Sequence, residues 1–278
     1  MPFYEDYGFD FYLYHITAHG NSGIMHLHPH WEMLLVPTAE ETKITINGNV
    51  YTTNEPMLAL FAPFCLHKVE FLEIKKPIER FVCYFGDNVF RDYFSVFSDY
   101  HNVLSQNFVM FPLSEELCKK CRHMIDQTAD YKLHSKEQKL LFLLILCTVL
   151  NEHSDDQLSK STSDFLQLSR IMKYMYEHLA ERMDADSVAQ QFYISRSKLD
   201  KDFQKYTTVS FRQLLIDMRL SHAAYLLASN PHQKISDIAT MSGFENENYF
   251  YSQFKQLFGT TPLKYQKDPL KYIRNVRI

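Results

Sequence analysis

The sequence predicts an α+β protein of more than one domain, with a β-rich N-terminal part and an all-helical C-terminal part that holds two helix-turn-helix units. Three observations lead to this fold class. Short runs rich in β-branched and aromatic residues fill residues 10–85. Helical patterns take over from about residue 88. Two stretches, residues 184–211 and 235–262, each combine a short helix, a tight turn and a longer amphipathic helix.

The composition is that of a globular protein, with 46% hydrophobic and 22% charged residues. Seven glycines, without a phosphate-binding glycine signature, argue against a nucleotide-binding loop. Five cysteines form an odd and sparse set, which favours a reducing compartment over a disulfide scaffold. Cys118 and Cys121 form a CxxC pair inside a predicted helix without a second ligand pair, so we expect them to pack in the core.

The N-terminus has neither the basic start nor the apolar segment of a signal peptide. The longest apolar run, residues 140–150, is shorter than the roughly 20 residues that cross a bilayer. From these two features we expect a cytoplasmic protein with no membrane partner.

The N-terminal part contains six predicted strands whose regular spacing suggests a barrel or a sandwich. Asn47 and Gly48 mark a hairpin turn between two of them. The predicted strand segments are residues 9–16, 25–36, 42–48, 49–53, 56–62 and 80–85.

Two helices, residues 114–131 and 135–153, are predicted to follow the strands. The polar stretch 154–164 lacks periodicity and is interpreted as a linker. The predicted domains are therefore residues 1–90, 91–153 and 165–278 on either side of that linker. Helices are expected in the last domain over residues 165–182, 187–192, 196–206, 211–228, 236–241, 247–258 and from 262 onward.

Charge is distributed unevenly between the two halves. From residue 166 onward there are 16 Lys+Arg against 11 Asp+Glu, whereas residues 1–165 hold 13 against 22. A basic C-terminal half beside an acidic N-terminal half is typical of a nucleic-acid-binding domain joined to a separate partner domain.

The stretch 216–268 resembles the signature of AraC/XylS-family transcription regulators, and the resemblance extends over residues 166–268. The resemblance implies a transcription regulator that binds double-stranded DNA sequence-specifically, without enzymatic activity or a cofactor. The matching positions are Arg219, Leu220, Ala223, Leu226, Leu227, Ile235, Ile238, Ala239, Gly243, Phe244, Tyr249, Phe250, Phe254, Lys255, Gly259, Thr261, Pro262 and Tyr265.

The first unit departs from the family pattern at two positions. Tyr193 stands in its turn where glycine is usual, and Thr208 replaces the glycine after the second helix. Backbone with positive φ is costly for such residues, so either the backbone differs or strain is accepted.

The resemblance also implies which residues contact DNA. We expect Lys201 to donate to guanine and Asn248 to pair with adenine, while Asp200 and Glu247 accept from cytosine; contact with phosphate alone is the alternative. About one DNA turn, near 34 Å, is the natural spacing of the two contacts. Arg219 is expected to be a structural ion-pair residue. The candidates are Arg196, Ser197, Asp200, Lys201 and Gln204 in the first unit and Asn246, Glu247, Asn248, Tyr251 and Ser252 in the second.

Residues 20–32 match the first cupin motif, and strand alternation would place His26, His28, His30 and Glu32 on one face. His67 stands where the second motif supplies a histidine. The resemblance, over residues 10–85, implies a barrel that binds a small-molecule effector such as a sugar or related metabolite without metal. Metal binding by the histidines and the glutamate, or structural polar packing, are the alternatives. The expected effector-binding residues are His26, His28, Glu32, His67, Trp31 and Tyr12.

The helices near residues 113–151 resemble the dimerisation helices of AraC-type regulators, which implies a homodimer, with RNA polymerase as a further partner. The second hypothesis is a metal-dependent cupin enzyme or metal sensor fused to a DNA-binding domain. A third is a constitutive regulator whose barrel only dimerises.

Overall fold

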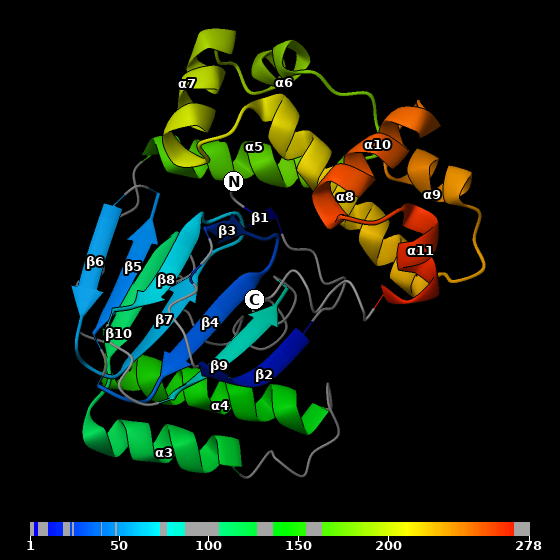
Figure 1. The fold of residues 1–278 in the computed structure, drawn as a ribbon. Helices are drawn as coiled ribbons and strands as arrows, with labels where there is room; N and C mark the ends of the chain where they lie inside the picture. Colours follow the sequence, from blue (N-terminus) through cyan, green and yellow to red (C-terminus); the bar gives the residue numbers. More distant parts are fainter. Residues whose placement is uncertain are drawn as a thin grey trace. The chain divides into compact units, whose positions relative to one another are not determined.

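The computed structural model describes residues 3–4, 11–18, 23, 25–39, 41–47, 49–72, 77–86, 106–126, 136–153 and 163–269. The chain divides into two compact units (Figure 1). Residues 9–166 form the β unit, and residues 167–278 together with residues 1–8 form the helical unit. This division agrees with the predicted order of a β-rich part followed by an all-helical part.

The β unit contains two antiparallel sheets. One includes, in spatial order, β3 (His26–Leu27), β8 (His67–Phe71), β5 (Thr42–Ile46) and β6 (Asn49–Thr53). The other has the order β10 (Phe108–Pro112), β7 (Met57–Phe61), β4 (Trp31–Val36), β9 (Ile78–Phe85) and β2 (Phe11–Ala18). A two-residue strand, β1 (Phe3–Tyr4), comes first along the chain.

The predicted hairpin is confirmed by the pairing of β5 with β6. Ile46 pairs with Asn49, so only two residues turn the chain. Asn47 has a φ of 49°, as the favoured two-residue hairpin turns require.

Three strands were absent from the sequence-based prediction, one of which is the two-residue β1. β8 is short and alternates between buried and half-buried residues, so its apolar signal is weak. β10 lies in the region predicted to be helical, and it pairs along its whole length with β7 at the sheet edge. The predicted strand 25–36 is also interrupted, because Pro29 separates β3 from β4 and the two belong to different sheets.

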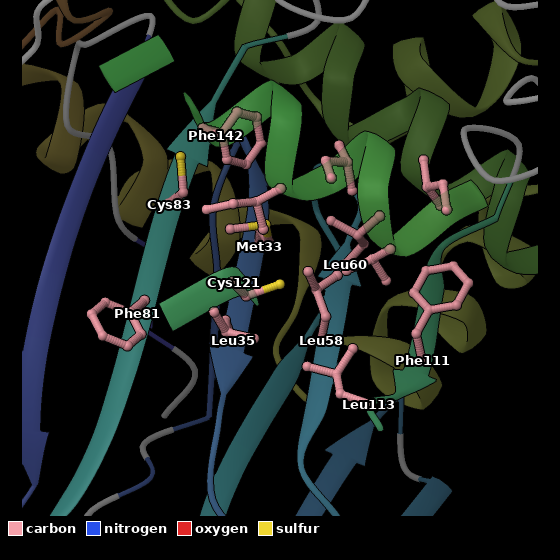
Figure 2. Close-up of a cluster of buried hydrophobic side chains, with 14 of the residues drawn as sticks. Met33, Leu35, Leu58, Leu60, Phe81, Cys83, Phe111, Leu113, Cys121 and Phe142 are labelled. Carbon is pink, nitrogen blue, oxygen red and sulfur yellow. The ribbon is translucent and has the colours of Figure 1, made fainter. Parts of the chain in front are cut away.

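The core of the β unit lies between the sheet that contains β4 and two helices, α3 (Glu115–Asp126) and α4 (Lys136–Glu152), which pack against one of its faces (Figure 1). Figure 2 shows Met33 and Leu60 from the sheet beside Phe142 of α4. Cys118 and Cys121 are buried in this core as free thiols, which confirms their predicted packing role. Leu140 and Leu144 lie on the exposed side of α4.

The helical unit holds seven helices in its described residues, and α7, α9, α10 and α11 all contact the long helix α8 (Figure 1). The predicted bounds agree with these helices within two residues, except that α5 ends five residues earlier than expected. No described helix combines the length and apolar character needed to span a bilayer. The helices are α5 (Ser163–Glu177), α6 (Ala185–Gln191), α7 (Arg196–Tyr206), α8 (Phe211–Ser229), α9 (Ile235–Met241), α10 (Glu247–Phe258) and α11 (Pro262–Lys267).

Candidate nucleic-acid interface and histidine cluster

The first helix-turn-helix unit consists of α6 and α7, and side-chain caps define where both helices begin. Asp184 accepts hydrogen bonds from the N–H groups of Asp186 and Ser187, and Ser187 completes a capping box. Ser195 accepts from the N–H of Lys198, so α7 starts at Arg196. The side chain of Ser195 therefore defines where the second helix of this unit begins.

The buried side of α7 is apolar and the opposite side is polar. Leu199 and Phe203 are fully buried. The five residues predicted to contact DNA are all exposed, as such contacts require: Arg196, Ser197, Asp200, Lys201 and Gln204.

Arg196 is held by two carboxylates at the start of α7. Its Nε donates to both carboxylate oxygens of Asp200, at 3.1 and 3.0 Å, and its Nη1 donates to Asp186 at 3.1 Å. The carboxylate of Asp200 is therefore already occupied, and its expected contact with cytosine would require this ion pair to open. These ion pairs hold the guanidinium of Arg196 in one orientation. Its Nη2 makes no hydrogen bond among the described residues.

The second unit consists of α9 and α10. Asn246 caps α10, because its Oδ1 accepts from the N–H of Tyr249 at 2.9 Å. Glu247, Asn248 and Ser252 are exposed, whereas Tyr251 is half-buried. The side-chain oxygen of Asn246 is therefore used to cap α10. The exposed residues that follow it are better placed to contact a base.

For the first unit the sequence allowed either a different backbone or a strained one, and the structure has the strained backbone. Tyr193 has a φ of 55° and Thr208 a φ of 60°, so both adopt the left-handed conformation that glycine would adopt without cost. Arg219 is structural, as expected, but its close partners are the backbone oxygens of Leu179 and Glu181 rather than an ion pair.

The second candidate site is a cluster of four polar side chains in the β unit. The cluster consists of His26, His28, Glu32 and His67, whose ligand atoms all lie within 4.8 Å of one another. Three histidine Nε2 atoms converge on one oxygen, Oε2 of Glu32: His28 at 2.9 Å, His67 at 3.0 Å and His26 at 3.8 Å. The four predicted residues are therefore brought together.

The cluster assembles across two sheets, since β3 and β8 pair His26 with His67 while β4 carries Glu32. The chain between β7 and β8 contributes to it, because Phe64 donates its N–H to the backbone oxygen of His28 at 2.8 Å. Phe64 makes this bond with a φ of 61°, a strained conformation for an aromatic residue.

Two expectations about this site are wrong, and a third concerns a side chain outside the described residues. His30 does not belong to the group of ligand atoms, because β3 ends before it and the alternation of one continuous strand is lost. Trp31 lies in the core with Met33, since it neighbours Glu32 on β4 and points to the opposite face. Tyr12 lies opposite Tyr84 in register, but its side chain is outside the described residues.

Two aromatic residues next to the cluster were not predicted. Phe61 stacks on His67 with ring centroids 4.0 Å apart, and Tyr84 meets His28 edge-on at 4.9 Å. Both pair with Glu32 in the strand register, which is the signal that would have identified them.

Burial controls the ionisation of the cluster. It lowers the pKa of His28 to about 4 and also lowers the pKa of His67. Burial alone would raise the pKa of Glu32, but the neighbouring histidines hold it well below its ordinary value. The arrangement is therefore a buried carboxylate surrounded by histidines that favour the neutral form.

Comparison with known proteins identifies a similar domain in the helical unit and relatives of the chain. A family model described as "Helix-turn-helix domain" matches residues 188–268. The chain is 27% identical over 125 residues to the Msm operon regulatory protein of Streptococcus mutans, and 26% identical over 137 residues to the transcriptional activator PerA of Escherichia coli O127:H6. These matches cover 45% and 49% of this chain and the same shares of the relatives, so the match spans about half the length of each.

The whole fold is similar to that of ToxT from Vibrio cholerae. An apo form of ToxT gives a TM-score of 0.56 at 14% identity, covering 93% of this chain and 97% of ToxT. ToxT has also been solved with an unsaturated fatty acid bound, with a TM-score of 0.52 at 17% identity over 92% of this chain and 94% of ToxT. Residues 188–268 thus form an AraC-type helix-turn-helix domain.

Proposed function

We propose that this protein is a sequence-specific DNA-binding transcription regulator rather than an enzyme. The observation that carries the proposal is that α7 and α10, each with a side-chain cap, expose polar residues within one helical unit. Two such helices fit two neighbouring stretches of the major groove. Curated relatives of this chain are named as regulators and activators of transcription, which supports the same function.

Selection of binding sites from random double-stranded DNA with the full chain tests this function. At physiological salt, affinity for the selected site should exceed affinity for a scrambled duplex by about 10³-fold or more. The logarithm of the binding constant should also fall linearly with the logarithm of salt concentration. Equal affinity for the two duplexes would reject sequence-specific regulation.

We further propose that the β unit controls DNA binding through a small organic effector at the histidine cluster. The imidazole and carboxylate groups of His26, His28, Glu32 and His67 supply donors and acceptors for the hydroxyl or carboxylate groups of a metabolite. In this proposal the protein works in the cytoplasm as a homodimer formed through residues 1–153, with RNA polymerase as a further partner and no metal requirement.

Thermal unfolding against a panel of sugars and carboxylic acids tests effector binding, because a true ligand raises the melting temperature by mass action. Glu32→Gln should abolish that shift and the accompanying change in DNA affinity, while DNA affinity without effector stays unchanged. His30→Ala is the matched control, since His30 is not among the converging ligand atoms. A ligand response that survives Glu32→Gln would place the effector elsewhere.

A metal sensor is a second candidate, favoured by the hydrogen bonds behind the cluster. The Nδ1 of His28 lies 2.7 Å from the backbone oxygen of His30, and the Nδ1 of His67 lies 2.9 Å from that of Cys65. A carbonyl oxygen only accepts, so both Nδ1 atoms carry hydrogen. In the neutral rings the Nε2 lone pairs then point at Glu32, which also only accepts.

Lone pairs that converge in this way are stabilised by a cation between them. Three imidazoles and one carboxylate are a donor set that suits Zn²⁺, Ni²⁺ or Fe²⁺. The backbone bonds to Nδ1 are the outer contacts that orient metal-binding histidines. Four ligands about 2 Å from a tetrahedral ion lie roughly 3.3 Å apart, close to the 2.9, 3.0 and 3.8 Å that separate Glu32 from the three histidines.

Equilibrium dialysis of chelator-treated full chain against Zn²⁺, Ni²⁺ and Fe²⁺ separates the two candidates. The metal sensor requires one ion per chain, lost in His28→Ala and kept in His30→Ala, together with a change in DNA affinity on loading. Absence of stoichiometric binding for all three ions would leave the organic effector as the ligand class.

A further inference from the structure

A junction around one backbone oxygen links the two helix-turn-helix units. The oxygen belongs to Leu179, in the turn that follows α5. Arg219 of α8 donates from Nε to this oxygen at 2.9 Å and from Nη2 to the oxygen of Glu181 at 2.7 Å. Gly243, in the turn between α9 and α10, approaches the same oxygen so closely that an added Cβ would lie 2.1 Å from it.

The α5 side of the junction is anchored to the first unit. Tyr174 of α5 meets Phe192, which ends α6, with an edge-on ring contact at 5.5 Å. Its backbone oxygen also accepts from the N–H of His178, so the chain continues without a break from α5 into the turn that holds Leu179. The position of Leu179 is therefore set by the first unit.

The Gly243 side is anchored to the second unit. Gly243 is followed by Phe244, which is buried in the core around α10, and Asn246 caps the start of α10. The same Cβ would lie 2.7 Å from Nε of Arg219, so the side chain of Arg219 fills the remaining space. Any shift of the second unit would have to displace this guanidinium.

The chemistry of the junction favours arginine. Burial lowers the pKa of Arg219, and the charge of Glu245 acts in the opposite direction. Its donors face two oxygens just beyond the C-terminal end of α5, where the helix dipole favours a cation. A planar guanidinium reaches both oxygens at once, whereas a lysine ammonium is a single point charge.

We propose that Arg219 is a positioning residue that fixes the distance and angle between the two DNA-contacting helices, so that the protein discriminates between operators by the spacing of their two half-sites. This inference rests on the proposed DNA-binding function. One added base pair moves a half-site by about 3.4 Å and rotates it by roughly 35° around the DNA axis. A rigid pair of helices loses one of its two contacts under that change, whereas a loosened pair adapts.

The test measures the affinity of the full chain for a selected operator and for versions with one or two base pairs inserted or deleted between the half-sites. The wild-type protein should lose affinity about tenfold or more at one base pair, which corresponds to one lost base contact. Arg219→Lys and Gly243→Ala should lose less than threefold in affinity on the same change of spacing. The wild type, these two variants and a control variant should all bind an isolated half-site with equal affinity.

The fourth protein is Gly259→Ala, a matched control. Gly259 has a φ of 68°, so alanine is strained there as at Gly243 with its φ of 82°, but an added Cβ at Gly259 meets nothing within 4 Å. Gly259→Ala should keep the wild-type spacing profile. Lower stability alone would reduce binding to every duplex equally and leave the profile unchanged.

The outcomes separate the two levels of the proposal. If the wild-type chain shows no preference for its selected operator, the DNA-binding function itself fails. If the wild-type chain has a sharp spacing optimum and Arg219→Lys retains it unchanged, the positioning role of Arg219 is wrong while the function stands.

Discussion

Tyr193 and Gly243 occupy the same position in the turns of the two helix-turn-helix units. Each donates its N–H to the oxygen three residues back, at 3.1 and 2.9 Å, and the next N–H reaches the oxygen five residues back in both turns. This pattern requires a left-handed residue, and the φ angles are 55° and 82°. The tyrosine ring is 96% exposed, so packing does not offset the strain.

Tyr193→Gly should therefore raise the free energy of unfolding. Left-handed backbone costs an ordinary residue about 1–2 kcal/mol, and glycine returns part of that gain through its freedom in the unfolded chain, which leaves roughly 0.5–1 kcal/mol. Urea unfolding followed by far-ultraviolet circular dichroism measures it. Tyr193→Ala is the control, because it removes the ring but keeps the strain. An equal gain from alanine would show that the exposed ring, and not the backbone, is the cost.

Lys201→Ala and Asn248→Ala should relax specificity at separate operator positions about one turn apart. Each lost base contact should cost about 1–3 kcal/mol at its own position. Competition binding against single-base variants of the selected operator maps these positions. A uniform loss across all variants would mark either residue as a phosphate contact. Asn246→Ala, which removes the cap of α10, should lower stability without changing base preference.

The helical unit was predictable because its signals are local. A polar cap and an apolar face define α7 and α10, and both helices begin and end where the sequence placed them. Ser195 and Asn246 act within four residues of their partners. Contacts within one helix or turn depend on neighbouring residues alone, and these can be inferred from the order of side chains.

The β unit was less predictable because its pairing is not local. β10 joins β7 across about fifty residues, and a five-residue segment ending in Pro112 has no periodicity that separates it from a helix end. The cluster residues were found through motif spacing, yet the reason given for their convergence was wrong, since β3 and β4 are separate strands. Trp31 was misplaced because its aromatic character was weighed above the strand alternation, which puts it on the face opposite Glu32.

Phe142→Ala should cost the β unit about 3–5 kcal/mol of unfolding free energy, the usual loss for a large buried aromatic. Phe142 is 1% exposed and meets Phe85 at 4.8 Å, on the sheet that α4 covers. The chain has one tryptophan, and Trp31 is buried beside Phe85, so its fluorescence reports unfolding of the β unit. A change below 1 kcal/mol would mean that α4 is not packed on the sheet.

Leu144→Glu should convert the proposed homodimer to a monomer. Leu144 is 53% exposed on the outer side of α4, where a buried partner would exclude a charge. Sedimentation of the full chain at micromolar concentration measures the mass. Leu263→Glu is the control, because Leu263 is 47% exposed but belongs to the helical unit. A monomeric wild-type protein, or a dimer that tolerates glutamate at Leu144, would contradict dimerisation through this helix.

Asp217 should make the helical unit less stable as the pH rises. It is a buried carboxyl in α8 whose closest partner is the side-chain amide of Gln213, at 2.9 Å. Burial raises the pKa of Asp217 to about 6, from an ordinary value near 3.8. Between these two values the folded chain binds more protons than the unfolded chain, so stability falls as pH rises from about 4 to 6 and stays low above that range.

Asp217→Asn removes this charge while keeping a group that can accept from Gln213. Its gain over the wild type should be largest above pH 7, roughly 1–2 kcal/mol, and should vanish near pH 4, where the aspartate is protonated in both states. Unfolding followed by helical circular dichroism at several pH values measures the difference. Asp237→Asn, at the exposed first turn of α9, should give no such gain, because its carboxylate interacts favourably with the helix start. A difference between wild type and Asp217→Asn that is independent of pH would show that the carboxyl does not titrate in this range.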